Sequence, residues 1–512
     1  MALPDLLCCL GLAITATTLM LLSRARAPLG ADEGYLWYGV QQWRKGRMPH
    51  RDFKSYEPGR YAWAGLWSRL LGPGLLALRV STHLFLAIAL AAALAGLRSF
   101  GLPWTGVAAA ALALALLSHP QHKQFEHGAA LSAWAVFGAF WSSPSPVLAG
   151  CAGATVGLSL FLGFNLFLYF SGALLLMLAA GAGIGVVPID RVDLASLAGG
   201  GLLGLLPFAW ACRDPEFVRN FHQRRIATVL SRGASNLSLP RPWPWRIPPA
   251  QLRGLGHARA IAFQWLFLAL FTVPLGALAL ALLAPRAYGE LVPAAMLGLC
   301  LSHHASSRAD PPHMLQSSGP LCVLGVQACG AHSWLSVLVA VACLWLCWPL
   351  HPLVQRRRDP DRFVRLDAGG WTIDTPMRHA HLLDAVVRWR ADTGNATLYA
   401  APAYPDLYAR LALDAPVYDT FSLYAASPQT QQQMIDQLAC SSVGIAVVSD
   451  APMDGRDALR FSATHALVWK HLHEAYGLQQ ARLGPDVHVF LRRGATPPEA
   501  PAVNVALALP AE

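Results

Sequence analysis

The chain has 512 residues, of which 54% are hydrophobic and only 13% are charged, and its mean hydropathy is +0.39. Soluble domains carry about 25% charged residues, so the composition argues against a soluble protein and favours a polytopic membrane protein. The formal charge of +10 is small for this length. Lys and Arg are not grouped into the compact runs that suggest nucleic-acid binding, so we expect contact with anionic lipid or phosphate and no nucleic-acid partner.

Eleven apolar segments approach the length of about 20 residues that spans hydrocarbon. We expect membrane helices near 4–23, 75–97, 103–118, 128–142, 147–163, 167–187, 194–211, 258–284, 288–302, 319–331 and 333–354. This count puts the long polar segments 24–74, 119–127, 212–257 and 303–318 on one side, together with the tail from residue 355. Charge leaves the orientation open, because Arg24 and Arg26 follow the first helix on that side.

The composition changes from about residue 355. Alternation and β-branched content predict strands at 397–401, 443–449 and 487–491. Amphipathic helices are predicted at 382–390, 431–438 and 463–473. We therefore expect a membrane domain at 1–354, a small α/β domain at 355–495, and a disordered tail at 496–512 that is rich in Pro and Ala.

The first long polar segment, 31–60, opens with adjacent carboxylates, Asp32 and Glu33, shortly after the first apolar run. Acids beside a bilayer are costly and usually have a partner or a function. Such an acid can act as a general base toward an acceptor hydroxyl, or it can bind a divalent metal. The alternative is a solvated acid that caps a helix beginning near Tyr35.

The same segment closes on Ser-Tyr-Glu-Pro-Gly-Arg, which contains Glu57 and Arg60. Arg60 can pair with Glu57 for structural reasons, or it can bind a phosphate bidentately. Trp63 and Trp67 follow. They either belong to an interfacial aromatic belt or form a stacking face for a sugar or the mouth of a lipid groove.

Two further groups of polar residues interrupt the apolar segments. The loop at 122–127 contributes Lys123, Glu126 and His127 at a helix entrance. These side chains are candidates for phosphate or acceptor binding, although ordinary interfacial residues would look the same. Asn165 lies between two apolar runs, where we expect a turn residue with a polar role in the cavity.

The last polar loop is the densest group. It contains His303, His304, Arg308, Asp310, His313 and Gln316. A histidine here could bind zinc together with a carboxylate, although HExxH spacing is missing. Arg308 is a candidate to bind phosphate. We expect this loop to be functional, with Asp310, His313 and Gln316 contributing to substrate binding.

These features together resemble the GT-C superfamily of integral membrane glycosyltransferases. A first membrane helix, then Asp32-Glu33, then a loop that closes on Tyr56-Glu57-Pro58 is similar to glycosyltransferase family 39. That family includes protein O-mannosyltransferases and the bacterial aminoarabinose transferases that modify lipid A. The segments 307–316, 398–408 and 416–420 are similar to those of uncharacterised bacterial members, so the resemblance spans most of the chain.

The resemblance implies a hexosyl or pentosyl transferase of the cell envelope. Such enzymes pass a sugar from a polyprenyl-phosphate carrier to a lipid, glycan or protein acceptor, and they use no nucleotide cofactor. The implied location is the bacterial inner membrane, with the catalytic loops and the C-terminal domain in the periplasm.

By the family pattern, Asp32 is the catalytic acid and Glu33 is its neighbour. Glu57 matches a glutamate at which a divalent metal is a candidate cofactor, with His303 or His304 as partner. Two departures are visible. Pro58-Gly59-Arg60 replaces the Lys-Pro-Pro of the lipid A enzymes, and Phe164 and Leu166 flank Asn165 where other members carry Arg and His.

The implied mechanism is a single displacement with inversion at the anomeric carbon. An acid activates the acceptor, and Arg308, Lys123 and Arg60 stabilise the departing phosphate. Other classes stay open at this point. A lipid flippase or transporter explains the helix count but not the asymmetric loops, and no pseudo-repeat is visible. A glycan ligase or polymerase of the same fold, and a non-catalytic assembly partner, are further alternatives.

Overall fold

The computed structural model describes residues 2–118, 120–184, 190–232, 237–248, 256–330, 332–394, 396–479, 483 and 486–493. The predicted disordered tail, 496–512, lies outside these residues. The chain divides into two compact units. Unit 1 is built from residues 1–26, 43–51 and 56–358, and unit 2 from residues 27–42, 52–55 and the chain after 358.

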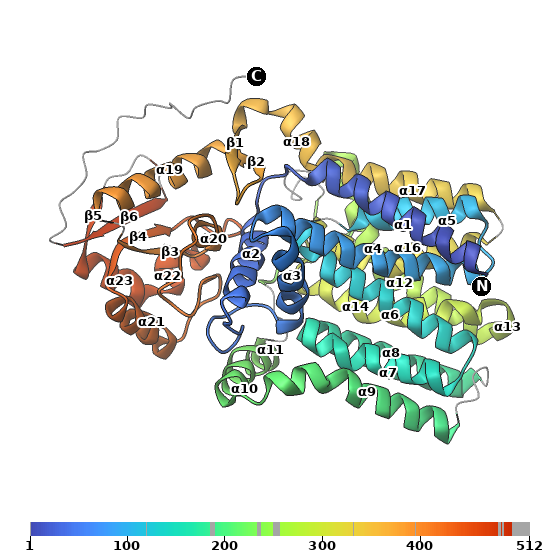
Figure 1. Cartoon of the computed structure of the whole chain (residues 1–512). Helices are drawn as coiled ribbons and strands as arrows, with labels where there is room; N and C mark the ends of the chain where they lie inside the picture. Colours follow the sequence, from blue (N-terminus) through green and yellow to red (C-terminus); the bar gives the residue numbers. More distant parts are fainter. Residues whose placement is uncertain are drawn as a thin grey trace. The chain divides into compact units, whose positions relative to one another are not determined.

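Unit 1 is a bundle of helices (Figure 1), and each of the eleven apolar segments predicted from the sequence contains one. The long helices are α1 (Leu3–Arg24), α4 (Leu75–Ser99), α5 (Trp104–Leu117), α6 (Gln124–Ser142), α7 (Pro146–Leu162), α8 (Phe164–Ile184), α9 (Arg191–Ala211), α12 (His257–Leu283), α14 (Val292–Ser307), α16 (Gly319–Cys329) and α17 (Ser333–Cys347). Shorter helical elements connect them: α3 (Pro58–Leu71), η1 (Gln121–Lys123), α10 (Pro215–Phe221), η2 (His222–Ile226), α11 (Ala227–Arg232), α13 (Pro285–Tyr288), η4 (Gly289–Leu291), α15 (Pro311–Ser317), η5 (Trp348–Leu350) and α18 (Pro352–Arg358).

Length and composition support a multi-pass membrane protein. Among the described residues, five helices, α1, α4, α8, α9 and α12, are long and apolar enough to cross a membrane, and the bent run from Trp334 to Arg358 supplies a sixth span if it is counted as one. α5, α7 and α16 are apolar but shorter. α6 and α14 belong to neither group: α6 has 19 residues and α14 has 16, and both carry polar residues such as Glu126 and His304.

α7 and α9 show how closely two of these helices approach (Figure 1). A Cβ atom at Gly157 would lie 2.3 Å from the carbonyl oxygen of Gly201, and one at Gly204 would lie 2.3 Å from that of Ala154. Small residues spaced by four positions allow this backbone contact, which is a common way for helices to associate in lipid. Pairs of glycines therefore specify this helix pair.

Unit 2 contains two small sheets. β1 (Phe363–Asp367) pairs antiparallel with β2 (Thr372–Pro376). The larger sheet has the order β3-β4-β6-β5, in which β3 (Thr397–Ala401) and β4 (Val443–Ser449) are parallel, and β6 (Val487–Arg492) is antiparallel to both β4 and β5 (Tyr476–Gln479). The three strands predicted from the sequence are confirmed. β1, β2 and β5 were missed, because each is short and none has a clear alternating apolar pattern.

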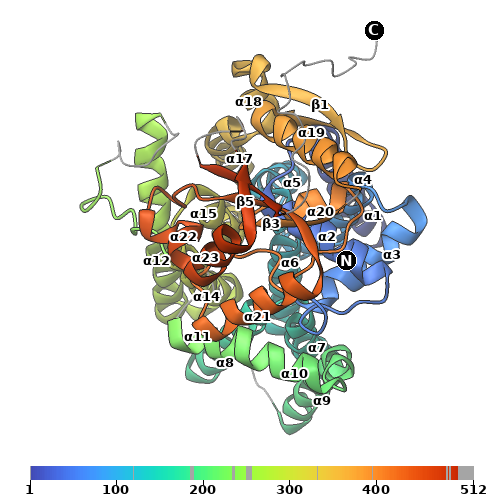
Figure 2. The same ribbon diagram turned by 90° about the vertical axis from the view of Figure 1, so that its left-hand side faces the viewer.

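Helices complete unit 2 (Figure 2). They are η6 (Pro360–Arg362), α19 (Met377–Asp392), α20 (Pro405–Arg410), α21 (Pro428–Cys440), η7 (Asp457–Leu459), α22 (Phe461–Thr464) and α23 (Ala466–Ala475). α21 and α23 pack against each other, and a core of buried side chains such as Tyr399, Val448 and Phe490 lies between helices and sheet. Unit 2 also includes α2 (Ala31–Arg44) as far as Gln42. The sequence had placed this segment with the membrane domain.

Candidate functional site

A buried ion pair stands at the start of α3. Glu57 precedes Pro58, the first residue of the helix, and its side chain has no exposed surface. Pro is favoured at this position, and the helix dipole favours a carboxylate there. The Nε atom of Arg225 donates a hydrogen bond to Glu57 Oε1 at 2.8 Å. Arg225 lies on η2, within the segment 212–257 that we expected to be a loop.

Glu57 is held in its charged form. Burial opposes its ionisation, but its interactions with Arg225, His50 and Arg60 and with the backbone of Phe164 together outweigh that effect, so the pKa of Glu57 is lowered. His50 is buried between the rings of Phe217 and Phe221. Burial lowers the pKa of His50 to about 4, so this histidine is neutral near pH 7.

A second charged group gathers around Arg60, two residues after Pro58. Its Nη1 atom lies 2.8 Å from Glu126 Oε1, and its Nε atom donates to the Leu162 carbonyl at 2.8 Å. The guanidinium also lies 4.6 Å from the ring centroid of Tyr56. Lys123 Nζ is 3.8 Å from the same oxygen of Glu126. α3, the end of α7, η1 and α6 therefore converge on one cluster of charges in unit 1.

This cluster can bind an anion and hydroxyl groups at the same time. Arg60, Lys123 and Arg225 supply three cations against the two carboxylates of Glu57 and Glu126, which leaves one positive charge. Within the part of the chain that the structure describes, Oε2 of Glu57 and Oε2 of Glu126 are buried and accept no hydrogen bond. Unsatisfied buried acceptors are costly, so these two oxygens are suited to a ligand that brings donors.

The loop that follows α14 forms a connected network. Asp310 caps α15 by accepting a hydrogen bond from the backbone N–H of His313 at 3.0 Å, and Pro311 begins the helix. Asp310 also lies 2.6 Å from His313 Nδ1 and accepts from Arg308 Nε at 2.8 Å. Burial opposes ionisation of Asp310, but the His313 and Arg308 interactions outweigh it and lower its pKa to about 2. Arg308 also donates to the Leu237 carbonyl at 3.1 Å.

His304 links this loop to the charged cluster. Its Nε2 atom lies 2.8 Å from Gln316 Oε1, and its ring centroid lies 5.1 Å from that of His313. The charges of Lys123 and Glu126 also act on His304. The structure thus brings together the 122–127 loop and the 303–316 loop, which the sequence analysis had singled out separately.

The other predicted residues of unit 1 are placed as follows. His127 is buried in the first turn of α6, and Asn165 is half-buried in the first turn of α8. His303 Nδ1 lies 3.1 Å from the hydroxyl oxygen of Tyr169. His303 therefore contacts α8, and His304 contacts both α15 and the Tyr169 ring on α8.

The residues named as metal ligands do not fit a metal as a set. Glu57 Oε1 is bound by Arg225, His303 lies beside the Tyr169 hydroxyl, and His304 lies beside the Gln316 side chain. Among the described residues, no three His, Cys, Asp or Glu side chains lie close enough to hold a metal ion. A divalent metal at Glu57 would have to compete with the guanidinium of Arg225.

Asp32 and Glu33 lie in the first turn of α2, in unit 2. Glu33 is 5% exposed. The structure therefore assigns the predicted catalytic acids to a different compact unit from Glu57 and Arg60, although all four residues belong to one short stretch of sequence.

The sequence analysis missed Arg225, because nothing in its local pattern connects it to Glu57. The only available signal was the pair Arg224-Arg225 in a polar segment between two apolar runs. Two adjacent arginines beside a membrane would have justified a search for a buried carboxylate.

Comparison with known proteins supports the fold. No protein-family model matches the sequence, and no curated protein matches it. Among solved structures, ArnT from Cupriavidus metallidurans bound to undecaprenyl phosphate matches 98% of this chain and 100% of its own, with 14% identity and a TM-score of 0.54. The chain therefore shares the fold of this ArnT structure. This confirms the fold that the sequence resemblance implied.

Two weaker matches complete the comparison. ArnT from Cupriavidus metallidurans in the apo state matches over 94% of this chain and 97% of its own, with 14% identity and a TM-score of 0.48. The oligosaccharyltransferase of Archaeoglobus fulgidus in the apo form matches over 97% of this chain and 75% of its own, with 13% identity and a TM-score of 0.45.

Proposed function

We propose that this protein transfers a hexosyl or pentosyl group from a polyprenyl-phosphate carrier to an acceptor at the periplasmic face of the bacterial inner membrane. The observation that carries the proposal is the charged cluster of Arg60, Lys123 and Glu126, which is buried among membrane helices. A cluster with excess positive charge in that place suits a phosphate attached to a lipid chain.

The fold supports the lipid carrier. ArnT, which shares the fold, was solved with undecaprenyl phosphate bound. In this chain the phosphate would be bound by Arg60 and Lys123, with Arg308 as a further candidate. Arg308 also holds Asp310 and the Leu237 carbonyl, so its part in phosphate binding would require one of those contacts to open.

The sugar would be bound by the two buried carboxylates. Oε2 of Glu57 and Oε2 of Glu126 accept no hydrogen bond among the described residues. Hydroxyl groups of a sugar are donors that can reach such oxygens, and a carboxylate acceptor gives a hydrogen bond of about 1.5–3 kcal/mol. Arg60, which would bind the phosphate, and Glu126, which would bind the sugar, are therefore direct neighbours.

The chemistry is a single displacement. The acceptor oxygen or nitrogen attacks the anomeric carbon, the bond from that carbon to the phosphate oxygen breaks, and polyprenyl phosphate leaves with the electron pair. Asp32 takes the proton of the acceptor as general base, and Glu33 supports it. The cations stabilise the charge of the leaving phosphate. Because a lipid phosphate is a fair leaving group, positioning of the reactants should dominate the rate enhancement.

The experiment that tests the proposal supplies purified protein with a panel of radiolabelled polyprenyl-phosphate sugars and membrane extract. Asp32→Asn gives the background, and Asp392→Asn, at an exposed position of α19, is the matched control. Transfer from one donor by the wild type and the control, but not by Asp32→Asn, supports the proposal. Lipid scrambling without sugar transfer would instead indicate a flippase.

A further inference from the structure

α2 carries the two predicted catalytic acids and is buried on almost all of its faces. The side chains that follow Glu33 are at most 5% exposed, namely Tyr35, Leu36, Trp37, Tyr38 and Val40. A helix that is buried on all faces is held by its surroundings and not by its own propensity. The position of Asp32 and Glu33 therefore depends on what surrounds α2.

Gly34, the residue directly after the two acids, brings α2 into close contact with α20. A Cβ atom at Gly34 would come within 2.6 Å of the Cβ atom of Asp406 on α20. Asp406 itself is fixed, because its Oδ2 atom lies 2.6 Å from His379 Nε2 and 3.6 Å from Arg410 Nε. Only glycine at position 34 allows α2 to contact α20 at this distance.

Aromatic rings continue the contact along α2. The ring centroid of Tyr35 lies 4.9 Å from that of Phe421, and that of Tyr38 lies 5.6 Å from that of Tyr408. The hydroxyl oxygen of Tyr38 accepts a hydrogen bond from the backbone N–H of Ala415 at 3.0 Å. Aromatic pairs of this kind stabilise a contact beyond the apolar area that they bury.

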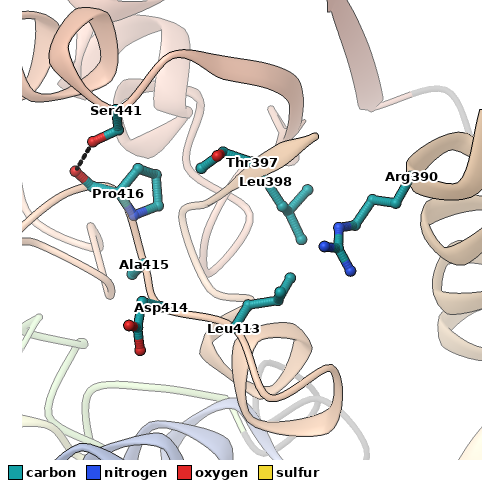
Figure 3. A pocket seen from close by; sticks show the side chains of 8 residues that line it. All are labelled: Arg390, Thr397, Leu398, Leu413, Asp414, Ala415, Pro416 and Ser441. Carbon is teal, nitrogen blue, oxygen red and sulfur yellow. Dashed lines mark hydrogen bonds between the residues drawn. The ribbon is translucent and has the colours of Figure 1, made fainter. Parts of the chain in front are cut away.

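Polar contacts fix the C-terminal half of the same helix. Gln41 Nε2 donates to the Ala409 carbonyl at 3.0 Å, and Gln42 Nε2 donates to Asp414 Oδ1 at 3.1 Å. Asp414 belongs to the segment 413–416, which borders a cavity of about 390 Å³ that is lined also by Arg390, Thr397, Leu398 and Ser441 (Figure 3).

The chain that follows α2 makes further contacts within unit 2, through Lys54. Lys54 Nζ donates to Asp419 Oδ2 at 2.6 Å, and the backbone N–H of Lys54 donates to the Tyr418 carbonyl at 2.9 Å. The hydroxyl of Tyr35 donates to the Lys54 carbonyl at 2.6 Å. The Asp419 side chain is 8% exposed, so removal of either charge would leave the other one poorly solvated.

We infer that unit 2 is the positioning element for the acids of the first loop. It holds α2 through a set of residues that we call the α2 clamp: Asp406, Tyr408, Asp414, Asp419 and Phe421. Three of these five residues, Asp406, Tyr408 and Asp419, lie in the segments 398–408 and 416–420 that the sequence analysis singled out. The clamp residues touch no substrate. They act through α2, and this role rests on the proposed function, in which Asp32 is the general base.

The test measures hydrogen–deuterium exchange of the α2 amides in the full-length protein, together with kcat and KM for the donor. Gly34→Ala adds a methyl group that collides with Asp406, and Gly30→Ala is the matched control, since a Cβ atom there meets nothing within 4 Å. Asp419→Asn removes the charge that binds Lys54, and Asp419→Glu is the conservative variant. If Gly34→Ala fails to fold, Asp419→Asn still decides the question.

We expect α2 amides to exchange roughly tenfold faster in Gly34→Ala and Asp419→Asn, equivalent to the loss of about 1.4 kcal/mol. kcat should fall at least as much, while KM for the donor stays unchanged, and Asp419→Glu should recover part of kcat. Unchanged exchange in both variants would overturn the inference. Faster exchange with unchanged kcat would contradict its catalytic part. If the wild type transfers no sugar, the proposed function fails, but the exchange data still decide whether unit 2 holds α2.

Discussion

Arg225 Nε donates a hydrogen bond to Glu57 Oε1 at 2.8 Å, across 168 positions of the chain. Glu57 is completely buried, whereas Arg225 is 23% exposed in its side chain. The arginine therefore supplies the positive charge that a buried carboxylate needs. It also occupies the place beside Glu57 where the family resemblance had led us to consider a metal.

Replacement of Arg225 by Met should destabilise unit 1, because it leaves Glu57 buried without its main counter-ion. Removal of one partner of a buried pair costs about 3–5 kcal/mol. The partial exposure of Arg225 places this case at the lower end of that range. Thermal unfolding of the detergent-solubilised protein measures the loss as a lower Tm.

Two comparisons make that prediction specific. Arg219→Met removes a surface arginine that pairs with Glu216 on α10, and it should leave Tm within about 1 °C, since exposed pairs contribute about 0–1 kcal/mol. The double variant Arg225→Met/Glu57→Gln should recover part of the stability. A double variant no more stable than Arg225→Met would show that the pair is not what stabilises this region.

Arg60→Lys should weaken donor binding without abolishing the fold. Lysine keeps the charge beside Glu126 but loses the planar fork that contacts Leu162 and could hold a phosphate. The loss of one charge-assisted hydrogen bond is about 1.5–3 kcal/mol, so we expect KM for the polyprenyl-phosphate donor to rise roughly tenfold or more. Arg69→Lys, at an exposed position of the same helix, is the control. Equal KM values for both variants would remove Arg60 from the phosphate site.

Stability should fall as the pH is lowered from about 6.5 toward 4, because burial lowers the pKa of His50 from 6.5 to about 4. In this range the unfolded chain binds a proton at His50 and the folded chain does not, so protons favour unfolding. The stability is fully present above pH 6.5, and the loss down to pH 4 amounts to about 3 kcal/mol. His50→Asn, which tolerates the positive φ of 65° at this position, should flatten the dependence. An unchanged pH profile in this variant would show that His50 is accessible to protons in the fold.

The C-terminal unit should lie in the periplasm. The expected helix count puts it on the same side as the first loop, and the family resemblance places that loop outside the cytoplasm. A fusion of alkaline phosphatase to the C-terminus should be active in intact cells, and the matching fusion of a fluorescent protein that folds only in the cytoplasm should be dark. The reverse pattern would require a different orientation or an even number of spans before unit 2.

The sequence predicts the helices well and the shape of the site poorly. The apolar segments of unit 1 and three strands of unit 2 follow from local periodicity, which depends on neighbouring residues only. The polar helices α6 and α14 pass through the core with Glu126 and His304, and they were predicted as membrane segments shorter than they are. Their polar first or last turns looked like loops.

The site depends on contacts between distant residues. Glu57, Arg60, Lys123 and Glu126 were each identified from residue type and place, but Arg225 was missed. Lys54 and Asp419 are 365 positions apart, and neither one alone has a distinctive pattern. The close approach of Gly34 to Asp406 could not be predicted either, because a glycine in the sequence is compatible with many local conformations and does not reveal a tertiary contact.

The central claim is that a polyprenyl-phosphate sugar is consumed and that Asp32 is needed for it. The most direct measurement is a single-turnover reaction in which free polyprenyl phosphate and glycosylated acceptor are quantified together by mass spectrometry. We predict that the two products appear in equal amounts with the wild-type protein and with Asp392→Asn, and that Asp32→Asn reduces both at least 100-fold, roughly the lower end of what a positioned general base contributes. Release of polyprenyl phosphate that is equal in the wild type and Asp32→Asn, or its absence with every donor supplied, would contradict the account.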